Sequence, residues 1–305
     1  ASPLAKGLFK KAIAESGAMF SADGNGVGLK TAEKNGEDFF KKINAASVEA
    51  LRKMPADSLQ KLAASFRASP VIDGYVLPKD VYAIFNNDEQ NDVVVLTGWN
   101  GDDGFPSGNI PDAKKSAEDA KEKSGALADE YLKAFPGNTN DEISKSLFAL
   151  NRDNLFAWQA YTWARMETAK GHHNVYVYMF NRTSPGQEKY GAFHSSEIPF
   201  ALNNLHTWNL NFTDADKRLA NIMSDYWVNF AKTGNPNGAS VSEWKPFRAS
   251  ENKVMVLDIN EQTMKPIAVK DQFDFIDNIK ATCGVSSNNI SISRNIKMLY
   301  NLTGF

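Results

Sequence analysis

Ten residues in the second half of the chain, Gly191 to Phe200, read GAFHSSEIPF and contain the best candidate for acid–base chemistry. In this stretch His194 lies between a glycine-led turn and an acid three positions later, Glu197. Histidine has the unperturbed pKa nearest to neutrality, so it is the usual general base. A single histidine near aromatic residues is, however, more often a packed or solvated side chain. A catalytic role for His194 therefore depends on partners elsewhere in the chain.

A candidate acid lies about ninety residues earlier, in the glycine-rich stretch TGWNGDDGF, which contains Asp102 and Asp103. An acid beside a histidine fixes the tautomer of the imidazole and stabilises its charged form, while the imidazole takes a proton from a nucleophile. In α/β-hydrolases the order along the chain is serine, acid, histidine, and both aspartates precede His194. The alternative to a catalytic role for these aspartates is an exposed turn, because adjacent Asp and Gly residues are common turn formers.

The elements that must position these loops alternate between strands and helices. Continuous apolar runs predict buried strands at residues 12–15, 93–96, 175–180 and 254–257. Helical spacing predicts helices at residues 29–43, 47–53, 57–66, 112–123, 128–134, 140–170 and 272–280, and a further short one opened by residues 78–80. This alternation predicts an α/β fold with a mostly parallel central sheet flanked by helices, in which chemistry lies on loops beyond the carboxyl ends of strands.

One long helix in the second half has clear end signals. Thr213, followed three residues later by Asp216, resembles an N-terminal capping arrangement. Gly234 suits the position after the last turn, and Pro236 prevents continuation of the helix.

Composition narrows the possible functions. The 305 residues are 42% hydrophobic and 23% charged, which is ordinary for a globular chain of one or two domains. A net charge of −2 gives no reason to expect a nucleic-acid or membrane partner, and no apolar run approaches the length of a membrane span. The single cysteine, Cys283, excludes an internal disulfide and a cysteine-based zinc site. We expect no cofactor and no metal, since no phosphate-binding glycine loop occurs; the compartment is not indicated.

Five blocks of sequence resemble the type-B carboxylesterases, the family of bacterial para-nitrobenzyl esterases and cholinesterases. In chain order they are SPLAKGLFKKAIAESG, PVIDGYVLP, GWNGDDG, GAFHSSEIPF and DYWVNFAKTGNPNG. Their joint occurrence in the family's order is far more specific than any one block alone. The resemblance implies that residues 1–282 form the C-terminal portion of an α/β-hydrolase fold, and residues 283–305 then read as a loosely attached tail.

The resemblance also implies serine-dependent hydrolysis of a small carboxylic ester. Carried over by position, His194 is the general base and Asp103 is the acid, because Asp103 directly precedes the glycine of its loop. The family usually has glutamate there, so Asp102 remains an alternative. Ser16 and Glu197 match positions that form a buried hydrogen-bonding network beneath the site in the family, which implies support rather than chemistry.

The chain departs from the family in one large respect, because it contains no G-x-S-x-G. In the family, the nucleophile elbow and the glycine-rich oxyanion loop lie upstream of the block that opens this sequence. Loss of a triad member costs several orders of magnitude in rate, so we expect the chain alone to be inactive toward esters. We also expect it to aggregate, or to need a missing N-terminal segment or complementary chain, because its central strands would expose unpaired edges.

Two other functions are open at this stage. A non-catalytic cholinesterase-like homologue, used for binding or adhesion, or an inactive fragment would have no need of the acid and the histidine. Both loops are intact here, which favours descent from an esterase. A generic α/β binding protein with an accidental histidine does not account for the five linked blocks.

Overall fold

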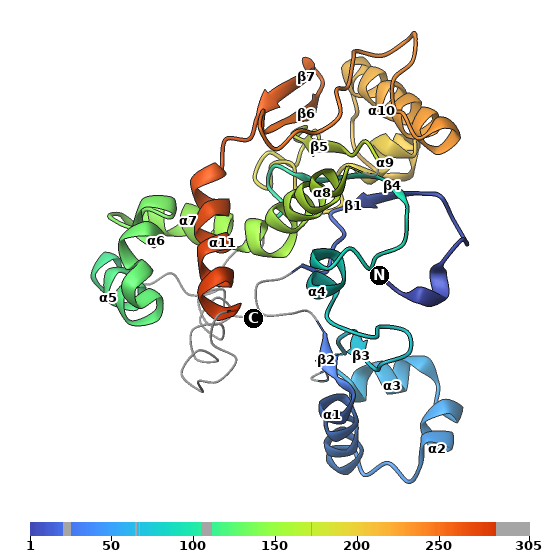
Figure 1. Cartoon of the computed structure of the whole chain (residues 1–305), viewed down its shortest axis with the longest axis vertical. Coiled ribbons are helices and arrows are strands. Elements are labelled where there is room, and N and C mark those ends of the chain that lie inside the picture. Colours follow the sequence, from blue (N-terminus) through green and yellow to red (C-terminus); the bar gives the residue numbers. More distant parts are fainter. Residues whose placement is uncertain (21–25, 65, 67, 105–111, 172, 285–305) are drawn as a thin grey trace. The chain divides into compact units, whose positions relative to one another are not determined.

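The computed structural model describes residues 1–20, 26–64, 66, 68–104, 112–171 and 173–284 (Figure 1). The chain forms two compact units, one of Ala1–Gly7 and Gly24–Asn91, the other of Leu8–Asp23 and Asp92–Phe305. In the described part, no helix combines the length and apolar character needed to cross a membrane. The tail predicted from residue 283 lies outside the described residues from 285 onward, so that prediction and the single domain over 1–282 remain predictions.

The larger unit is built on a five-stranded sheet with the order β1-β4-β5-β6-β7. The strands are β1 (Lys11–Glu15), β4 (Val94–Asn100), β5 (Tyr176–Phe180), β6 (Lys253–Asp258) and β7 (Glu261–Pro266). The first three pairings are parallel and the last is antiparallel. Helices lie on both sides of this sheet in Figure 1, so the predicted α/β fold with a mostly parallel sheet is confirmed.

The predicted strands correspond to β1, β4, β5 and β6, whereas β7 has no counterpart in the sequence analysis. Its residues, EQTMKP, are mostly polar and its side chains are half-buried or exposed, so no apolar run marks it. The strand forms because a tight connection turns the chain back from β6, whose residues from Val254 to Leu257 are buried. A strand of this kind depends on its pairing partner more than on its own pattern.

The described part of the larger unit contains seven helices. They are α5 (Ala113–Ser124), α6 (Ala128–Ala134), α7 (Asn140–Arg152), α8 (Trp158–Lys170), α9 (Ile198–Ala201), α10 (Asp214–Thr233) and α11 (Lys270–Gly284), with short 3-10 turns at Gly125–Leu127 and Leu205–Thr207. The prediction of one continuous helix over residues 140–170 is therefore wrong, because the helix is interrupted. A π-helical turn, Asp153–Ala157, separates α7 from α8 and inserts one residue into the helical register.

Helix α10 covers one face of the sheet, and its ends agree with the sequence signals. Thr213 and Asp216 form a reciprocal capping box, and Gly234 ends the helix with a φ of +80°. Its apolar stripe belongs to the main buried cluster together with side chains of β4, β5 and β6. The residues of the helix in that cluster are Leu219, Ala220, Met223, Tyr226, Trp227 and Phe230.

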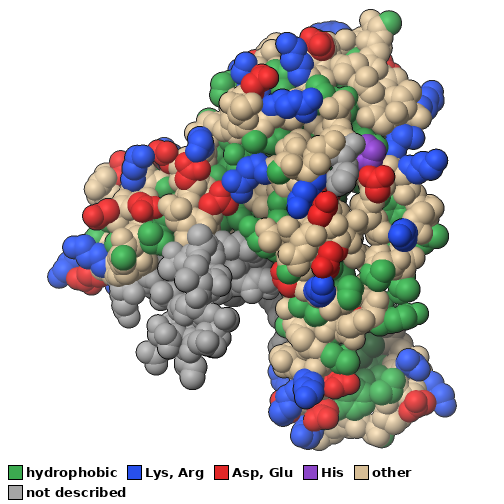
Figure 2. Space-filling view, viewed as in Figure 1, with side chains coloured by type: hydrophobic (Ala, Val, Ile, Leu, Met, Phe, Trp, Pro, Cys, Tyr) green, Lys and Arg blue, Asp and Glu red, His purple; other side chains and the backbone are tan. Residues whose placement is uncertain are grey.

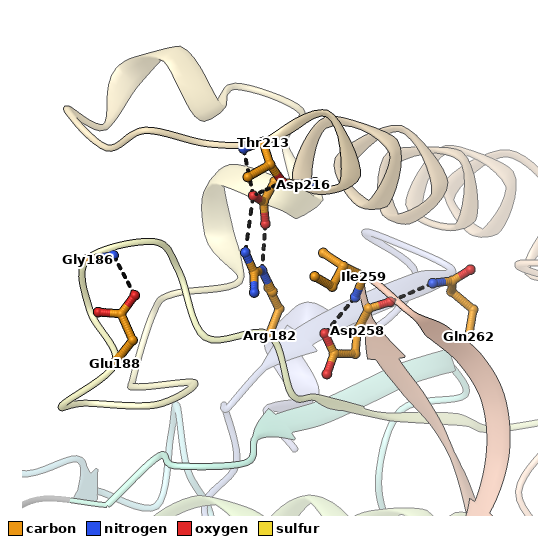
Figure 3. A network of polar contacts seen from close by, with 8 residues as sticks. All are labelled: Arg182, Gly186, Glu188, Thr213, Asp216, Asp258, Ile259 and Gln262. Carbon is orange, nitrogen blue, oxygen red and sulfur yellow. Dashed lines mark hydrogen bonds and ion pairs between the residues drawn. The ribbon is translucent and has the colours of Figure 1, made fainter.

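A buried ion pair ties the start of α10 to the segment that follows β5 (Figure 3). Arg182 Nε donates to Asp216 Oδ1 at 2.6 Å, and the Asp216 side chain is fully buried. Asp216 also accepts hydrogen bonds from the backbone N–H and the hydroxyl of Thr213. The ion pair thus holds the start of the segment that leads from β5 to His194.

The smaller unit contains α1 (Leu29–Lys42), α2 (Val48–Lys53), α3 (Ala56–Leu62), α4 (Val81–Asn86), a 3-10 turn (Pro3–Ala5) and a short parallel pair, β2 (Val27–Gly28) with β3 (Val71–Ile72). None of α1, α2 and α3 contains a fully buried residue. Hydrophobic side chains are accordingly visible among the charged ones on these helices (Figure 2). Those that are largely exposed are Leu29, Val48 and Leu62.

Candidate active site

The loops after β4 and β5 bring an acid and a histidine into contact. His194 Nδ1 lies 2.8 Å from Asp103 Oδ1. Because a carboxylate can only accept, the Nδ1–H donates and the proton is assigned to Nδ1. Asp103 is fully buried, whereas 40% of the His194 side chain is exposed. The pair therefore has its acid inside the protein and its base at the surface.

Two further donors hold the carboxylate of Asp103. The Ser16 hydroxyl donates to Oδ2 at 2.5 Å, and the backbone N–H of Asn100 donates to the same oxygen at 3.1 Å. Ser16 reaches it from the end of β1, where a left-handed backbone with a φ of +52° turns the chain away from the sheet. Its own N–H donates to Gly98 O at 3.0 Å. Both carboxylate oxygens are thus engaged, one by the histidine and one by this pair of donors.

Asp102, the alternative acid, makes different contacts. Its carboxylate accepts a hydrogen bond from Ala192 N at 2.9 Å, and its own N–H donates to Ala192 O at 3.0 Å. Gly191 precedes this contact with a φ of +63°, and a Cβ there would collide with the Asp102 carboxylate. Asp102 therefore joins the two loops to each other, and Asp103 is the aspartate that contacts His194.

Glu197 is linked to the acid loop through Asn100. The Asn100 amide donates to Glu197 Oε2 and, at 2.8 Å, to Phe193 O. Since the Asn100 backbone also donates to Asp103, one residue at the end of β4 contacts both acids. Burial raises the pKa of Glu197 to about 7, although the hydrogen bond from Asn100 opposes this shift. Of the predicted site residues, Ser16, Asp103 and His194 are in direct contact, and Glu197 is joined to them through Asn100.

The hydrogen bond to Asp103 raises the pKa of His194 above its ordinary value. Partial burial of the imidazole opposes this, and the negative charges of Asp103 and Glu197 add to the rise. An imidazole with this environment accepts a proton more readily than one in water and holds it beside a buried carboxylate. The arrangement suits a general base that becomes charged during a reaction.

Three residues around this pair were not predicted from the sequence: Asn100, Arg152 and Phe156. Asn100 lies in the block GWNGDDG but carries no acid–base chemistry that would have marked it. Arg152 and Phe156 lie about fifty residues after the acid, inside a stretch with a helical pattern. The Phe156 ring stacks on the His194 imidazole with centroids 4.5 Å apart and planes inclined by 19°. The adjacent charges of Arg152 and Asp153 are a signal in that stretch that could have indicated a polar contact.

The sequence of this chain is similar to those of known proteins of one family. A model described as "Carboxylesterase family" matches residues 1–276. The chain is 26% identical over 283 residues to the para-nitrobenzyl esterase of Bacillus subtilis, covering 85% of this chain and 55% of that protein. It is 25% identical over 303 residues to carboxylesterase 4A of Bos taurus, covering 85% and 54%. The chain thus spans about half the length of the curated relatives it matches.

The fold agrees with solved structures of the same kind. A structure titled "PNB esterase" superposes with a TM-score of 0.71 at 24% identity, covering 90% of this chain and 59% of that one. At this level of identity the superposition shows the fold.

Proposed function

Because this chain belongs to the carboxylesterase family, we propose that it supplies the acid and the base of a serine esterase, Asp103 and His194. The observation that supports this proposal most is the 2.8 Å contact between His194 Nδ1 and Asp103 Oδ1, across 91 residues of sequence. The substrate class is a carboxylic ester. Ser16, Asn100 and Glu197 would hold the pair without touching the substrate.

In the proposed reaction His194 acts through Nε2, because Nδ1 contacts Asp103. Nε2 takes the proton of a serine hydroxyl as the serine oxygen attacks the ester carbonyl. The same proton then passes to the leaving alcohol as the C–O bond breaks, leaving an acyl-serine that water cleaves by the same two steps. Asp103 stabilises the imidazolium that exists between these transfers.

The serine in this proposal comes from outside the 305 residues, because the sequence contains no G-x-S-x-G. We propose that it arrives on an additional strand that pairs with β1. Ser16 N donates to Gly98 O, so alternate residues of β1 face β4. The backbone groups of Lys11, Ile13 and Glu15 consequently point to the other side. Within the described part of the chain, β1 pairs with β4 alone.

The surroundings of β1 support an added strand. All five of its residues are half-buried, whereas six of the seven residues of β4 are fully buried. Parallel strands are normally covered on both faces, and an uncovered edge is a template for another strand. A parallel strand at this edge would lie roughly 10 Å from β4 and would end at the same side of the sheet as the acid–base pair.

Binding without catalysis, as in a cholinesterase-like binding or adhesion homologue, is the alternative function, and it would need neither Asp103 nor His194. A binding homologue would keep the fold while its histidine could be replaced without consequence. The two functions differ in their dependence on His194.

Hydrolysis of p-nitrophenyl acetate tests the proposed function. We expect no activity from the 305 residues alone and activity from a form extended upstream of Ala1 to include a G-x-S-x-G segment. Activity in the extended form should disappear in His194→Ala and remain in His206→Ala, whose histidine is exposed. An extended form that binds esters but never turns them over would support the binding alternative.

A further inference from the structure

Phe156 contacts the imidazole of His194 face to face, with ring centroids 4.5 Å apart and planes inclined by 19°. Phe156 is half-buried, and 40% of the His194 side chain is exposed. We propose that Phe156 is a positioning residue, which fixes the plane of the imidazole while Asp103 fixes the direction of Nδ1. This inference rests on the proposed function, in which His194 is the base.

A general base needs both the plane of its imidazole and the direction of its Nδ1 atom to be fixed. A hydrogen bond to Nδ1 sets the direction of one ring atom but does not set the tilt of the ring. Nε2 lies on the far side of the ring, so a change of tilt moves it relative to the attacking hydroxyl. A misplacement of about 1 Å can lower a rate roughly 100-fold. A flat side chain against the imidazole face limits this tilt.

The position of Phe156 is set by the π-helical turn Asp153–Ala157. Such turns are rare and frequently occur at functional sites. Asp153 is fully buried and pairs with Arg152 Nε at 2.7 Å. Arg152 in turn donates through Nη1 to Gly101 O at 3.3 Å, in the loop that carries the acid. One short segment therefore holds the ring over the histidine and contacts the loop of its partner acid.

The stacked ring also acts on the charge of the imidazole. The face of a phenyl ring is negative and attracts a cation placed over it. When His194 takes a proton, the imidazolium gains this attraction in addition to that of Asp103 and Glu197, the charged groups that raise its pKa. Phe156→Leu removes the aromatic face, keeps most of the apolar volume and leaves both acids in place. Phe156→Tyr keeps the aromatic face.

Nuclear magnetic resonance of histidine-labelled protein tests the contact without any need for esterase activity. In the unchanged extended form the imidazole protons of His194 should be shifted upfield relative to those of exposed His206, because they lie over an aromatic face. His194→Ala assigns the signal. Phe156→Leu should abolish the shift and lower the His194 titration midpoint by about half a unit. Phe156→Tyr should retain both.

A matched control separates positioning from packing. Phe247 is a buried aromatic whose N–H donates to Val175 O, at the opposite end of β5 from the site. Phe247→Leu should lower stability and leave the His194 signal and titration unchanged. Absence of the upfield shift in the unchanged extended form would overturn the inference, and so would a Phe156→Leu protein with unaltered shift and midpoint.

In the extended, catalytically active form, we expect Phe156→Leu to lower kcat about 10-fold to 100-fold while KM stays within about twofold of the unchanged protein. Phe156→Tyr should keep the kcat of the unchanged protein. Equal kcat values in the Leu variant and the unchanged protein would overturn the inference while leaving His194 as the base. Normal NMR behaviour combined with activity that is independent of His194 would instead overturn the proposed function.

Discussion

The hydroxyl of Ser16 donates a 2.5 Å hydrogen bond to Oδ2 of Asp103, the carboxylate whose other oxygen contacts His194. Ser16 directly follows β1 and Asp103 follows β4, so this bond joins the ends of two neighbouring parallel strands. It orients the carboxylate from the side opposite to the histidine. The acid–base pair is therefore fixed by the sheet itself rather than by its loops alone.

Removal of this hydroxyl should weaken catalysis without abolishing it. In the extended form we expect Ser16→Ala to lower kcat about 10-fold, the usual effect of losing a group that orients a reacting side chain. Ser146→Ala is the control, since Ser146 donates to Pro136 O at 2.6 Å in a bond away from the site. Equal losses in the two variants would show that Ser16 contributes only to stability.

The two adjacent aspartates should behave differently when each is changed to asparagine. Asp103→Asn should lower kcat by on the order of 10³-fold to 10⁴-fold, because an amide cannot stabilise the imidazolium or impose its tautomer. Asp102→Asn should change kcat little, since its amide oxygen can still accept from Ala192 N. Steady-state kinetics of both variants would decide between the two aspartates. A larger loss of kcat in Asp102→Asn would show that Asp102, and not Asp103, is the acid.

The Asp103→Asn substitution should also shift the pH dependence of activity. In the proposed mechanism activity requires neutral His194, so the activity should rise with pH through a midpoint above the ordinary histidine value, because Asp103 raises the pKa of His194. Asp103→Asn removes the main cause of the rise and should shift the midpoint to lower pH. A midpoint that stays in place would mean that another group controls the profile.

Glu197 should make the protein less stable as the pH rises toward neutrality. Its pKa is raised from 4.5 to about 7, so between these values the folded protein binds more protons than the unfolded chain. The free energy of unfolding must then fall as pH rises through this window, by about 3 kcal/mol for this group, and stay level above it. Glu197→Gln should lack this fall. Urea unfolding at pH 5 and pH 7.5 measures the difference, and parallel pH dependences in the two proteins would refute it.

The turn before the histidine should tolerate no side chain at Gly191. Gly191→Ala adds a collision with the Asp102 carboxylate to the strain of a φ of +63°. Gly186 has a φ of +74° with nothing near its Cβ position, so Gly186→Ala should cost only about 1 kcal/mol of backbone strain. We expect Gly191→Ala alone to lose most activity. Similar thermal midpoints and rates in the two variants would contradict the close approach of the loops.

The sequence predicted those parts of the fold that depend on local pattern. The apolar runs gave β1, β4, β5 and β6, and the capping residues Thr213 and Asp216 marked the start of α10. The polar edge strand β7 could not be predicted in the same way, because it forms through pairing with β6. The π-helical turn was missed because no proline or glycine within residues 140–170 marks the interruption between the two helices.

The site was predictable to the extent that its residues have characteristic chemistry. His194, Asp103, Ser16 and Glu197 were identified from motifs, and the structure joins them directly or through Asn100. Asp103 was predicted as the acid from its position in the motif, with Asp102 as the alternative, and the geometry of the loops shows which of the two contacts His194. Phe156 contacts His194, and Arg152 contacts Gly101 in the loop of the acid, through tertiary packing alone. Neither residue type suggests that role in sequence.

The central claim is that His194 is the base of an esterase whose serine lies outside these residues. The most direct measurement is p-nitrophenyl acetate hydrolysis by the form extended upstream of Ala1, compared between the unchanged protein and His194→Ala. We predict that His194→Ala lowers kcat by on the order of 10³-fold or more, while His206→Ala retains it. Full activity in His194→Ala would contradict the claim.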